Sequence, residues 1–224
     1  RRSSDLEPPV SASYLFNADM APYRELFLRR CPPPMLMPRG NQVCKKGVTK
    51  GWMYYLSQGL LKVYSSNSYG YDRVIAFLKD DNIFGLDCLD PDQPSVVTIE
   101  CVTDSWVMPL QSEMLTDIMR ESPDFACDLV AYYAKVMRQL CFDTENQSIN
   151  DAKVRLVNFL YLYAESSGDD RIAMSQQDLA AAANCSRSSI ARICTQLKEA
   201  GLIRVHGRGL TVLDRERLKA FCRL

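Results

Sequence analysis

The sequence predicts an α+β fold in which an antiparallel β-roll is followed by a long helix and a winged helix-turn-helix. Short segments rich in Val, Ile, Tyr and Trp alternate with turn residues over 31–110, a spacing typical of a sandwich or barrel-like roll. After Gln111, apolar residues recur at helical spacing instead. Near the C-terminus, two short helical segments joined by a tight turn precede a predicted β-hairpin.

Turn residues mark the limits of the predicted strands. Signals such as Pro38-Arg39-Gly40, Gln58-Gly59 and Asp80-Asp81-Asn82 separate them. A short helix over Ala21–Arg30 precedes the roll and ends at Pro32-Pro33-Pro34, because proline cannot continue a helix. The clearest predicted strands are Trp52–Leu56, Leu60–Tyr64, Val74–Leu78, Val96–Val102 and Ser105–Leu110.

The region after the roll is predicted to be helical. Ser112–Glu121 forms a short helix, and an apolar stripe with spacings of 4, 3, 4 and 4 follows it. The stripe alone does not decide between packing on its own domain and packing against a second copy. The polar segment Asp143–Asn150 is expected to be a hinge, and Asp151–Glu165 a second amphipathic helix. The stripe residues are Phe125, Leu129, Tyr132, Val136 and Leu140.

Residues 174–200 contain two helix-capping signals. Ser175 is a good N-cap for a helix over Gln176–Ala183, and Asn184 can adopt the left-handed conformation that ends it. Ser186 caps the next helix, which ends at Gly201. Its expected inward positions are Ile190, Ile193, Leu197 and Ala200. Helix, tight turn and helix are thus predicted in succession.

The predicted second helix has a polar outer face near its N-terminus, where a recognition helix meets base edges in the major groove. Arginine can bond guanine bidentately, and serine is a less discriminating partner. A hairpin formed by Leu202–Val205 and Leu210–Leu213 makes a wing, with His206 and Arg208 at its tip able to reach phosphates. The outer-face residues are Arg187, Ser188, Ser189 and Arg192. Together these features predict binding to double-stranded DNA.

The whole-chain charge hides this partner. The 224 residues contain 27 basic and 27 acidic side chains, a net charge that taken alone argues against nucleic-acid binding. Residues 1–150 contain 15 basic and 19 acidic residues, whereas 151–224 contain 12 and 8. A body of charge −4 therefore precedes a C-terminal part of +4, as expected of a DNA-binding module joined to another domain.

Compartment and enzyme class follow from what the sequence contains. The nine cysteines are odd in number and form no C-x-x-C pair, which favours reduced thiols in the cytoplasm. No apolar run approaches the roughly 18 residues of a membrane span, and no signal peptide is visible. The only histidine, His206, lies in the wing, and no nucleophile–base pair, Gly-rich phosphate loop or metal-ligand spacing is present. An enzyme is not expected.

Residues 20–215 resemble the Crp-Fnr superfamily of bacterial transcription regulators, chiefly over 45–64, 82–89 and 176–203. The resemblance implies a cyclic-nucleotide-binding-like jelly roll as sensor, a dimerisation helix and a winged helix-turn-helix that binds DNA. Its implied partners are a pseudo-palindromic operator, a second copy of the chain, RNA polymerase and an unknown small-molecule effector. The resulting division is 1–20 tail, 21–122 β-roll, 123–149 dimerisation helix and hinge, and 150–224 DNA-binding domain.

The resemblance also assigns DNA contacts residue by residue. It implies that Ser175, Gln177 and Ser186 contact phosphates together with His206 and Arg208. It further implies that Arg187, Ser188 and Arg192 face the bases. The family's frequent Glu after the first recognition arginine is Ser188 here, which puts the usual half-site preference in doubt.

The effector site departs from the cyclic-nucleotide pattern. The Arg-Ser pair that holds the cyclic phosphate in the family is replaced by Ser95-Val96, and no arginine occurs from Asp80 to Met119. Because burying a phosphate without a cation is costly, cyclic AMP is not expected. The corresponding pocket residues are Gly85, Leu86, Asp87, Ser95, Val96, Leu140 and Cys141.

Other sensing chemistries stay open as alternatives. No cofactor is predicted, but a haem or an iron–sulfur cluster built from dispersed cysteines is not excluded by the sequence. Only Cys31 and Cys44 precede residue 88, and the sole histidine lies in the wing. Thiol redox sensing is a further alternative, as is a constitutive DNA-binding factor without an effector.

Overall fold

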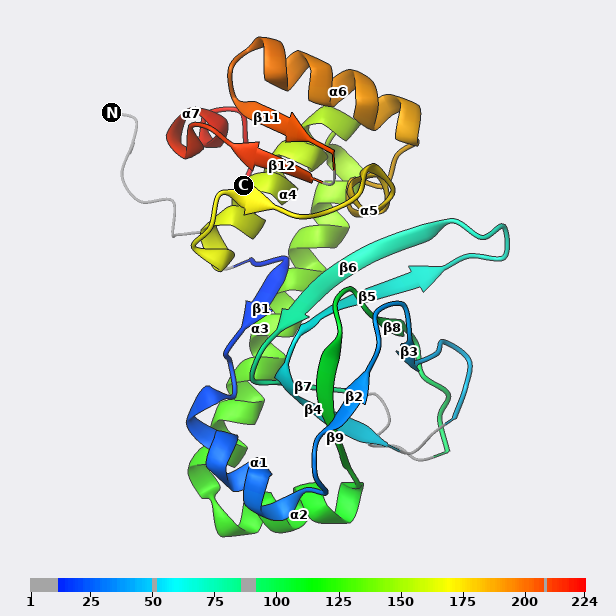
Figure 1. Cartoon of the computed structure of the whole chain (residues 1–224), viewed down its shortest axis with the longest axis vertical. Coiled ribbons are helices and arrows are strands. Elements are labelled where there is room, and N and C mark those ends of the chain that lie inside the picture. Colours follow the sequence, from blue (N-terminus) through cyan, green and yellow to red (C-terminus); the bar gives the residue numbers. More distant parts are fainter. Residues whose placement is uncertain (1–11, 50–51, 86–91, 208) are drawn as a thin grey trace.

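The N-terminal half is a β-roll, with one long helix running along it and a winged helix at its end (Figure 1). This computed structural model describes residues 12–49, 52–85, 92–207 and 209–224. Its α+β architecture, with an N-terminal roll and a C-terminal helix-turn-helix, confirms the predicted fold class.

Two sheets form the described part of the roll. One has the strand order β1-β6-β5-β8-β3 and the other β2-β9-β4-β7. All pairs are antiparallel except β1 with β6, which is parallel. The strands are β1 (Leu15–Asn17), β2 (Met35–Met37), β3 (Gln42–Cys44), β4 (Met53–Gln58), β5 (Leu60–Ser66), β6 (Asp72–Lys79), β7 (Asn82–Phe84), β8 (Thr98–Cys101) and β9 (Ser105–Leu110).

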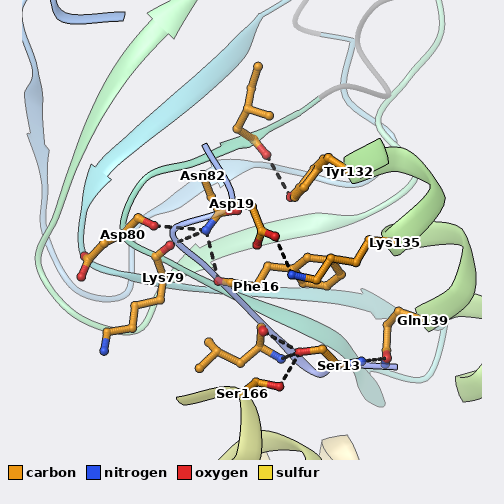
Figure 2. Close-up of polar contacts among 12 residues, drawn as sticks. Ser13, Phe16, Asp19, Lys79, Asp80, Asn82, Tyr132, Lys135, Gln139 and Ser166 are labelled. Carbon is orange, nitrogen blue, oxygen red and sulfur yellow. Dashed lines mark hydrogen bonds and ion pairs between the residues drawn. The ribbon is translucent and has the colours of Figure 1, made fainter. Parts of the chain in front are cut away.

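The five predicted strands all exist, and Ser105–Leu110 has the predicted limits. The strands that the sequence pattern missed in the roll are three residues long, too short to show an alternation. Asn82 was expected in a turn but begins β7 and is buried. Its amide Nδ2 donates to the carbonyl oxygens of Phe16, at 3.1 Å, and Lys79, at 2.5 Å (Figure 2).

The predicted N-terminal tail through residue 20 is wrong for the residues that the structure describes. Leu15 pairs with Phe77 of β6, and Tyr14, Leu15 and Phe16 are buried. Figure 2 shows this segment between the roll and two helices: the Ser13 amide donates to Gln139 at 2.9 Å, and its hydroxyl lies 2.7 Å from the hydroxyl of Ser166. Residues 12–20 therefore belong to the folded body.

The helices follow the predicted order. The short helix before the roll and the helix over Ser112–Glu121 are both present. They are a 3₁₀ turn at Ala21–Tyr23, α1 (Arg24–Arg30), α2 (Ser112–Glu121), α3 (Pro123–Ile149), α4 (Ala152–Ser167), α5 (Gln176–Ala182), α6 (Arg187–Glu199) and α7 (Arg215–Lys219). Among the described residues, none of these helices is long and apolar enough to cross a membrane.

The predicted hinge over Asp143–Asn150 is wrong, because α3 continues to Ile149. Two of the polar residues that suggested a linker, Asp143 and Asn146, are buried and paired instead. Asp143 accepts a hydrogen bond from the Tyr14 hydroxyl at 2.9 Å and forms an ion pair with Arg73. Asn146 is 1% exposed and donates to the same Tyr14 hydroxyl at 3.1 Å. The chain breaks only at Asn150 and Asp151, where Asp151 caps α4.

The apolar stripe of α3 faces mainly its own roll. Phe125, Leu129 and Tyr132 are buried in the core cluster of the two sheets, and Val136 is half-buried against it. Of the two alternatives left open by the sequence, Phe125, Leu129 and Tyr132 therefore pack on their own domain, and the dimer role that the resemblance implied is wrong at these three positions. Only Leu140 of the predicted stripe is exposed. These side chains pack on the roll because burying them there removes apolar surface of both the helix and the sheets from water.

A second core cluster joins the roll to the C-terminal part. Tyr64, Val74 and Phe77 of the first sheet belong to one cluster with Phe159 of α4 and the apolar residues of α5 and α6. Phe77 makes an edge contact with Tyr163 of α4, with ring centroids 5.6 Å apart. The winged helix therefore packs directly on the sheet that contains β5 and β6 (Figure 1).

Candidate nucleic-acid interface

The helix-turn-helix is built by the caps that the sequence predicts. The Ser175 hydroxyl accepts from the amide of Asp178 at 3.1 Å, and the Ser186 hydroxyl accepts from the amide of Ser189 at 3.1 Å. Asn184 lies in the left-handed region with φ +47°. Between the caps, the small residues Ala180–Ala183 are buried, which lets α6 cross α5 closely. The two helices are thereby held in fixed register.

The outer face of α6 contains the predicted DNA-reading residues. Arg187, Ser188 and Arg192 are exposed, and Ser189 is half-buried because it also closes the cap. Ile190, Ile193 and Leu197 are buried as expected, and α6 ends at Glu199, two residues before Gly201, whose φ is +69°. Ala200 is exposed rather than inward, because it is the C-cap residue at the last turn.

The wing is a small antiparallel sheet with the order β10-β12-β11. His206 pairs with Gly209 across its tip and is exposed, with its ring nitrogen Nε2 2.9 Å from the Thr211 hydroxyl. A Cβ on Gly209 would lie 2.4 Å from the carbonyl oxygen of Ile172, so only glycine fits there. Arg208 lies outside the described residues. The strands are β10 (Arg171–Ile172), β11 (Ile203–His206) and β12 (Gly209–Val212).

Predicted DNA-contacting residues, of both the phosphate and the base class, line two hollows beside the roll. Ser175, Arg187 and His206 line a cleft of about 800 Å³ whose opposite wall contains Arg39 and Thr103 of the roll. A second hollow, of about 670 Å³, lies between the turn of the helix-turn-helix and the tip of the β5–β6 hairpin. Its lining includes Gln177, Ser186, Arg187 and Ser188.

One ion pair links the sensor sheet to α5. The ammonium of Lys62 in β5 lies 3.1 Å from Asp178 and 3.6 Å from Glu100 of β8. Burial raises the pKa of the Asp178 carboxyl, but the Ser175 hydroxyl and the Lys62 ammonium lower it more, so this pKa lies below its ordinary value. The sequence gave no signal for this contact, because Lys62 and Asp178 are 116 positions apart.

The predicted effector residues are only partly brought together. Leu86 and Asp87 lie outside the described residues. The Ser95 hydroxyl donates to the carbonyl oxygen of Val97 at 2.9 Å, and Val96 is exposed. Leu140 lines a cavity of about 460 Å³ between α3 and the β5–β6 hairpin, which does not include Gly85, Ser95 or Val96. Lys46, Tyr71, Arg73 and Asp143 also line that cavity.

Most cysteines of the described residues are poor candidates for thiol chemistry. Burial raises the pKa of the Cys31 thiol to about 11 and that of Cys222 to about 12. Burial likewise raises the pKa of Cys101, Cys185 and Cys194. A thiol reacts as the thiolate, so these side chains are unreactive near neutral pH. Cys127 and Cys141 of α3 are exposed.

An exposed apolar face on α3 was not predicted. Val130, Tyr133, Met137 and Leu140 recur at spacings of 3, 4 and 3 and are 67%, 39%, 61% and 40% exposed. The same spacing is visible in the sequence. It was overlooked because the stripe from Phe125 to Leu140, on the neighbouring face of α3, shows a similar spacing. We call these four residues the α3 seam.

Two family models match the chain at the places where the fold has a roll and a helix-turn-helix. The cyclic nucleotide-binding domain matches residues 35–122, and the Crp-like helix-turn-helix domain matches residues 154–221. The chain belongs to the Crp-Fnr superfamily. It is thus of the DNA-binding transcriptional regulator type, as the sequence resemblance implied.

Relatives of this superfamily cover most of the chain. The cyclic AMP receptor protein of Thermus thermophilus is 24% identical over 171 residues, 76% of this chain and 79% of the relative. Among solved structures, FixK2 from Bradyrhizobium japonicum has a TM-score of 0.74 at 19% identity and covers 85% of this chain and 97% of that one. The c-di-GMP-responsive regulator CLP of Xanthomonas campestris has a TM-score of 0.76 at 17% identity, with 87% and 99% covered. These two structures support the fold.

Proposed function

We propose that this Crp-Fnr regulator acts as a homodimer that binds a pseudo-palindromic operator through α6. Half-sites about one helical turn (~34 Å) apart would each receive one recognition helix in the major groove. The observation that carries the proposal is the capped helix-turn-helix with Arg187 and Arg192 exposed on α6, beside a wing that presents His206. No catalytic role is part of this proposal.

The α3 seam supplies the surface for the second copy. Its residues repeat with the a and d spacing of a two-stranded coiled coil, and burying one such side chain contributes roughly 1.5–3 kcal/mol. Two copies of α3 paired along Val130, Tyr133, Met137 and Leu140 would place the two winged helices on one side of the dimer. Each roll keeps its own cover, since Phe125, Leu129 and Tyr132 face away from this seam.

A signal received in the roll reaches α6 through contacts that join the two parts. Lys62 links β5 to Asp178 of α5, and Tyr14 links the N-terminal segment to Asp143 of α3. The core cluster that contains Phe77 and Phe159 connects the same sheet to α4. A ligand that favours one arrangement of these contacts changes operator affinity by shifting the population of two states. RNA polymerase is the partner through which such binding would affect transcription.

We propose that the effector is a small organic molecule other than cyclic AMP. The segment that corresponds to the cyclic-phosphate loop has Ser95 and Val96 in place of a cation, and the Ser95 hydroxyl is already bonded to the backbone. The cavity of about 460 Å³ beside α3 is within the size range of ligand sites. Its wall includes the Arg73–Asp143 ion pair, and an acidic ligand could take the place of Asp143 as the partner of Arg73.

DNA binding is tested by selecting duplexes from a random pool with the purified full chain. The expected result is a recurrent two-fold sequence, bound with an affinity that falls linearly with log salt. Retention of the pool without enrichment, together with equal affinity for any duplex, would contradict the proposal.

The signal is tested on protein purified without oxygen. A featureless ultraviolet–visible spectrum and no bound iron are expected, followed by a change in operator affinity on titration with small organic acids. Haem or iron–sulfur absorption bands would contradict the organic effector. Operator affinity unaffected by any ligand or oxidant would instead favour a constitutive factor.

A further inference from the structure

The cleft of about 800 Å³ lies between the roll and the winged helix. Its roll wall contains Arg39 and Leu60, and its other wall contains residues of α5, α6 and the wing. A volume of this size is within the range of sites that bind small molecules. The cleft is separate from the cavity of about 460 Å³ beside α3, with which it shares no lining residue.

The floor of the cleft is apolar. Leu60 and Val102 of the roll line it and pack against the core cluster that joins the roll to the winged helix. Met174, Leu179 and Leu210 of the winged helix also line it and are buried members of that cluster. An apolar group placed on this floor would be removed from water, which favours binding.

Backbone hydrogen bonds hold the roll wall in place. The carbonyl oxygen of Leu60 accepts from the amide of Val102 at 2.8 Å, and the amide of Leu60 donates to the Thr103 hydroxyl at 3.0 Å. The amide of Gly40, next to Arg39, donates to the carbonyl oxygen of Cys101 at 2.8 Å. The wall is therefore formed before any ligand arrives, which lowers the entropy cost of binding.

The two walls each supply an arginine without a counter-ion. Arg39 and Arg187 are exposed, and neither guanidinium has a hydrogen-bond or ion-pair partner among the residues that the structure describes. The carboxylate of Asp178, which also lines the cleft, is already bonded to Lys62 and Ser175. Guanidinium groups bind acidic oxygens through charge-assisted hydrogen bonds, so the cleft favours an anionic group.

We propose that this cleft binds a small amphipathic anion, with the apolar body of the ligand on the floor and its acidic group held by Arg39 and Arg187. Such a ligand contacts the roll and the winged helix at once. It therefore holds the winged helix against the sensor domain.

The same ligand competes with operator DNA. Arg187 is assigned to the bases by the proposed function, and Ser175 and His206 of the same cleft are assigned to phosphates. A guanidinium that holds the ligand is not available to a base, so each binding event weakens the other by an equal factor. This part of the inference rests on the proposed function, whereas binding of the anion itself does not.

The test uses anilinonaphthalene sulfonate, a fluorescent probe with an apolar ring system and one acidic group, on the purified full chain. Binding is expected with a stoichiometry of one probe per chain, and saturating operator should displace the probe. At a probe concentration about ten times its Kd, the apparent Kd for operator should rise at least about ten-fold. Inorganic sulfate, which lacks the apolar body, is expected to displace neither the probe nor the operator at the same ionic strength.

Two variants separate the two halves of the site. Arg39→Ala is expected to weaken probe binding about ten-fold, the loss of one charge-assisted hydrogen bond. Val205→Thr removes apolar surface from an exposed residue of the cleft at nearly constant shape and is expected to weaken probe binding about three-fold. Arg120→Ala is the matched control, since Arg120 is exposed on α2 at the end of the roll far from the winged helix (Figure 1), and it should bind the probe like the unmodified protein.

Equal probe affinity in Arg39→Ala and Arg120→Ala would overturn the inference, because the dye would then bind elsewhere. A probe that operator does not displace would overturn the competition. Failure of the unmodified protein to prefer its operator over random DNA without any probe would instead overturn the proposed function, and the effect of Arg39→Ala on the probe would still decide whether the cleft binds anions.

Discussion

Replacing Tyr14 by Phe removes one hydroxyl from the place where the N-terminal segment, the roll and α3 meet. That hydroxyl donates to Asp143 at 2.9 Å and accepts from the amide of Asn146 at 3.1 Å. Burial and the Asp143 carboxylate raise the pKa of the Tyr14 phenol, so the hydroxyl stays protonated and acts as a donor at neutral pH. We expect Tyr14→Phe to destabilise the protein and loosen the last turns of α3.

The magnitude follows from what each partner retains. A hydrogen bond to a charged group contributes about 1.5–3 kcal/mol and a neutral one about 0.5–1.5 kcal/mol. Asp143 keeps its contacts with Arg73 and Gln147, so the contribution lost at Asp143 is expected at the lower end of the range for a charged group. The Asn146 Nδ2 group loses the only partner that it has among the described residues. The free energy of unfolding is therefore expected to fall by about 2–3 kcal/mol.

Urea unfolding of Tyr14→Phe and Tyr163→Phe provides the assay. Tyr163 is 7% exposed in the same core cluster, and its hydroxyl has no hydrogen-bond partner among the described residues, so its removal is expected to change stability by less than about 0.5 kcal/mol. Hydrogen exchange of the amides of residues 143–149 should also increase in Tyr14→Phe alone. Equal stabilities of the two variants, with unchanged exchange, would refute the reasoning.

Four further predictions concern stability, association and thiols. The folded-state pKa values of about 11 for Cys31 and about 12 for Cys222 lie above the unfolded value of about 8.5, so stability is full below that pH and is lost as pH rises toward the folded values. Urea unfolding at pH 7.5 and 10.5 checks this, and equal free energies would contradict it. Lys62→Met leaves Asp178 and Glu100 facing each other without a cation, so the free energy of unfolding should fall by about 1–2 kcal/mol and the pKa of Asp178 should rise. Replacement of the exposed Lys198 by Met should change neither quantity. Met137→Asp should yield monomers in sedimentation experiments, whereas Arg138→Asp should leave the dimer intact because Arg138 is not part of the α3 seam. If both variants were dimeric, the dimer contact would lie elsewhere. Cys127 and Cys141 should react with a disulfide reagent in native protein well before Cys31 and Cys222, and uniform reactivity would show that the buried thiols are accessible.

Local signals in the sequence predicted the DNA-reading end of the molecule well. Caps and left-handed turns depend on residues within four positions of each other, so Ser175, Asn184 and Ser186 specify the helix-turn-helix without help from the rest of the chain. The strand over Ser105–Leu110 and the helix over Ser112–Glu121 were likewise predicted correctly from the residues within each segment.

Features that depend on distant partners could not be predicted in this way. Asp143 and Asn146 are typical linker residues in sequence, and only Tyr14, 129 and 132 positions away, explains why they are buried in a helix. The stripe from Phe125 to Leu140 has the spacing of a helix packed on any apolar surface, so periodicity cannot tell the roll from a second copy. The effector residues could not be predicted for the same reason. Leu140 lines a cavity together with residues of the β5–β6 hairpin, which is distant from it in the sequence.

The central claim is that α6 reads the operator, and Arg192→Ala tests it most directly. Arg192 is exposed on α6 and takes no part in the helix caps or the core. Fluorescence anisotropy measures the affinity of both proteins for the selected operator and for a scrambled duplex at one salt concentration. The unmodified protein is expected to prefer its operator by at least roughly 10³-fold, and the variant to lose about 1–3 kcal/mol of that preference per half-site while binding scrambled DNA nearly as before. An unchanged preference in Arg192→Ala would contradict the claim.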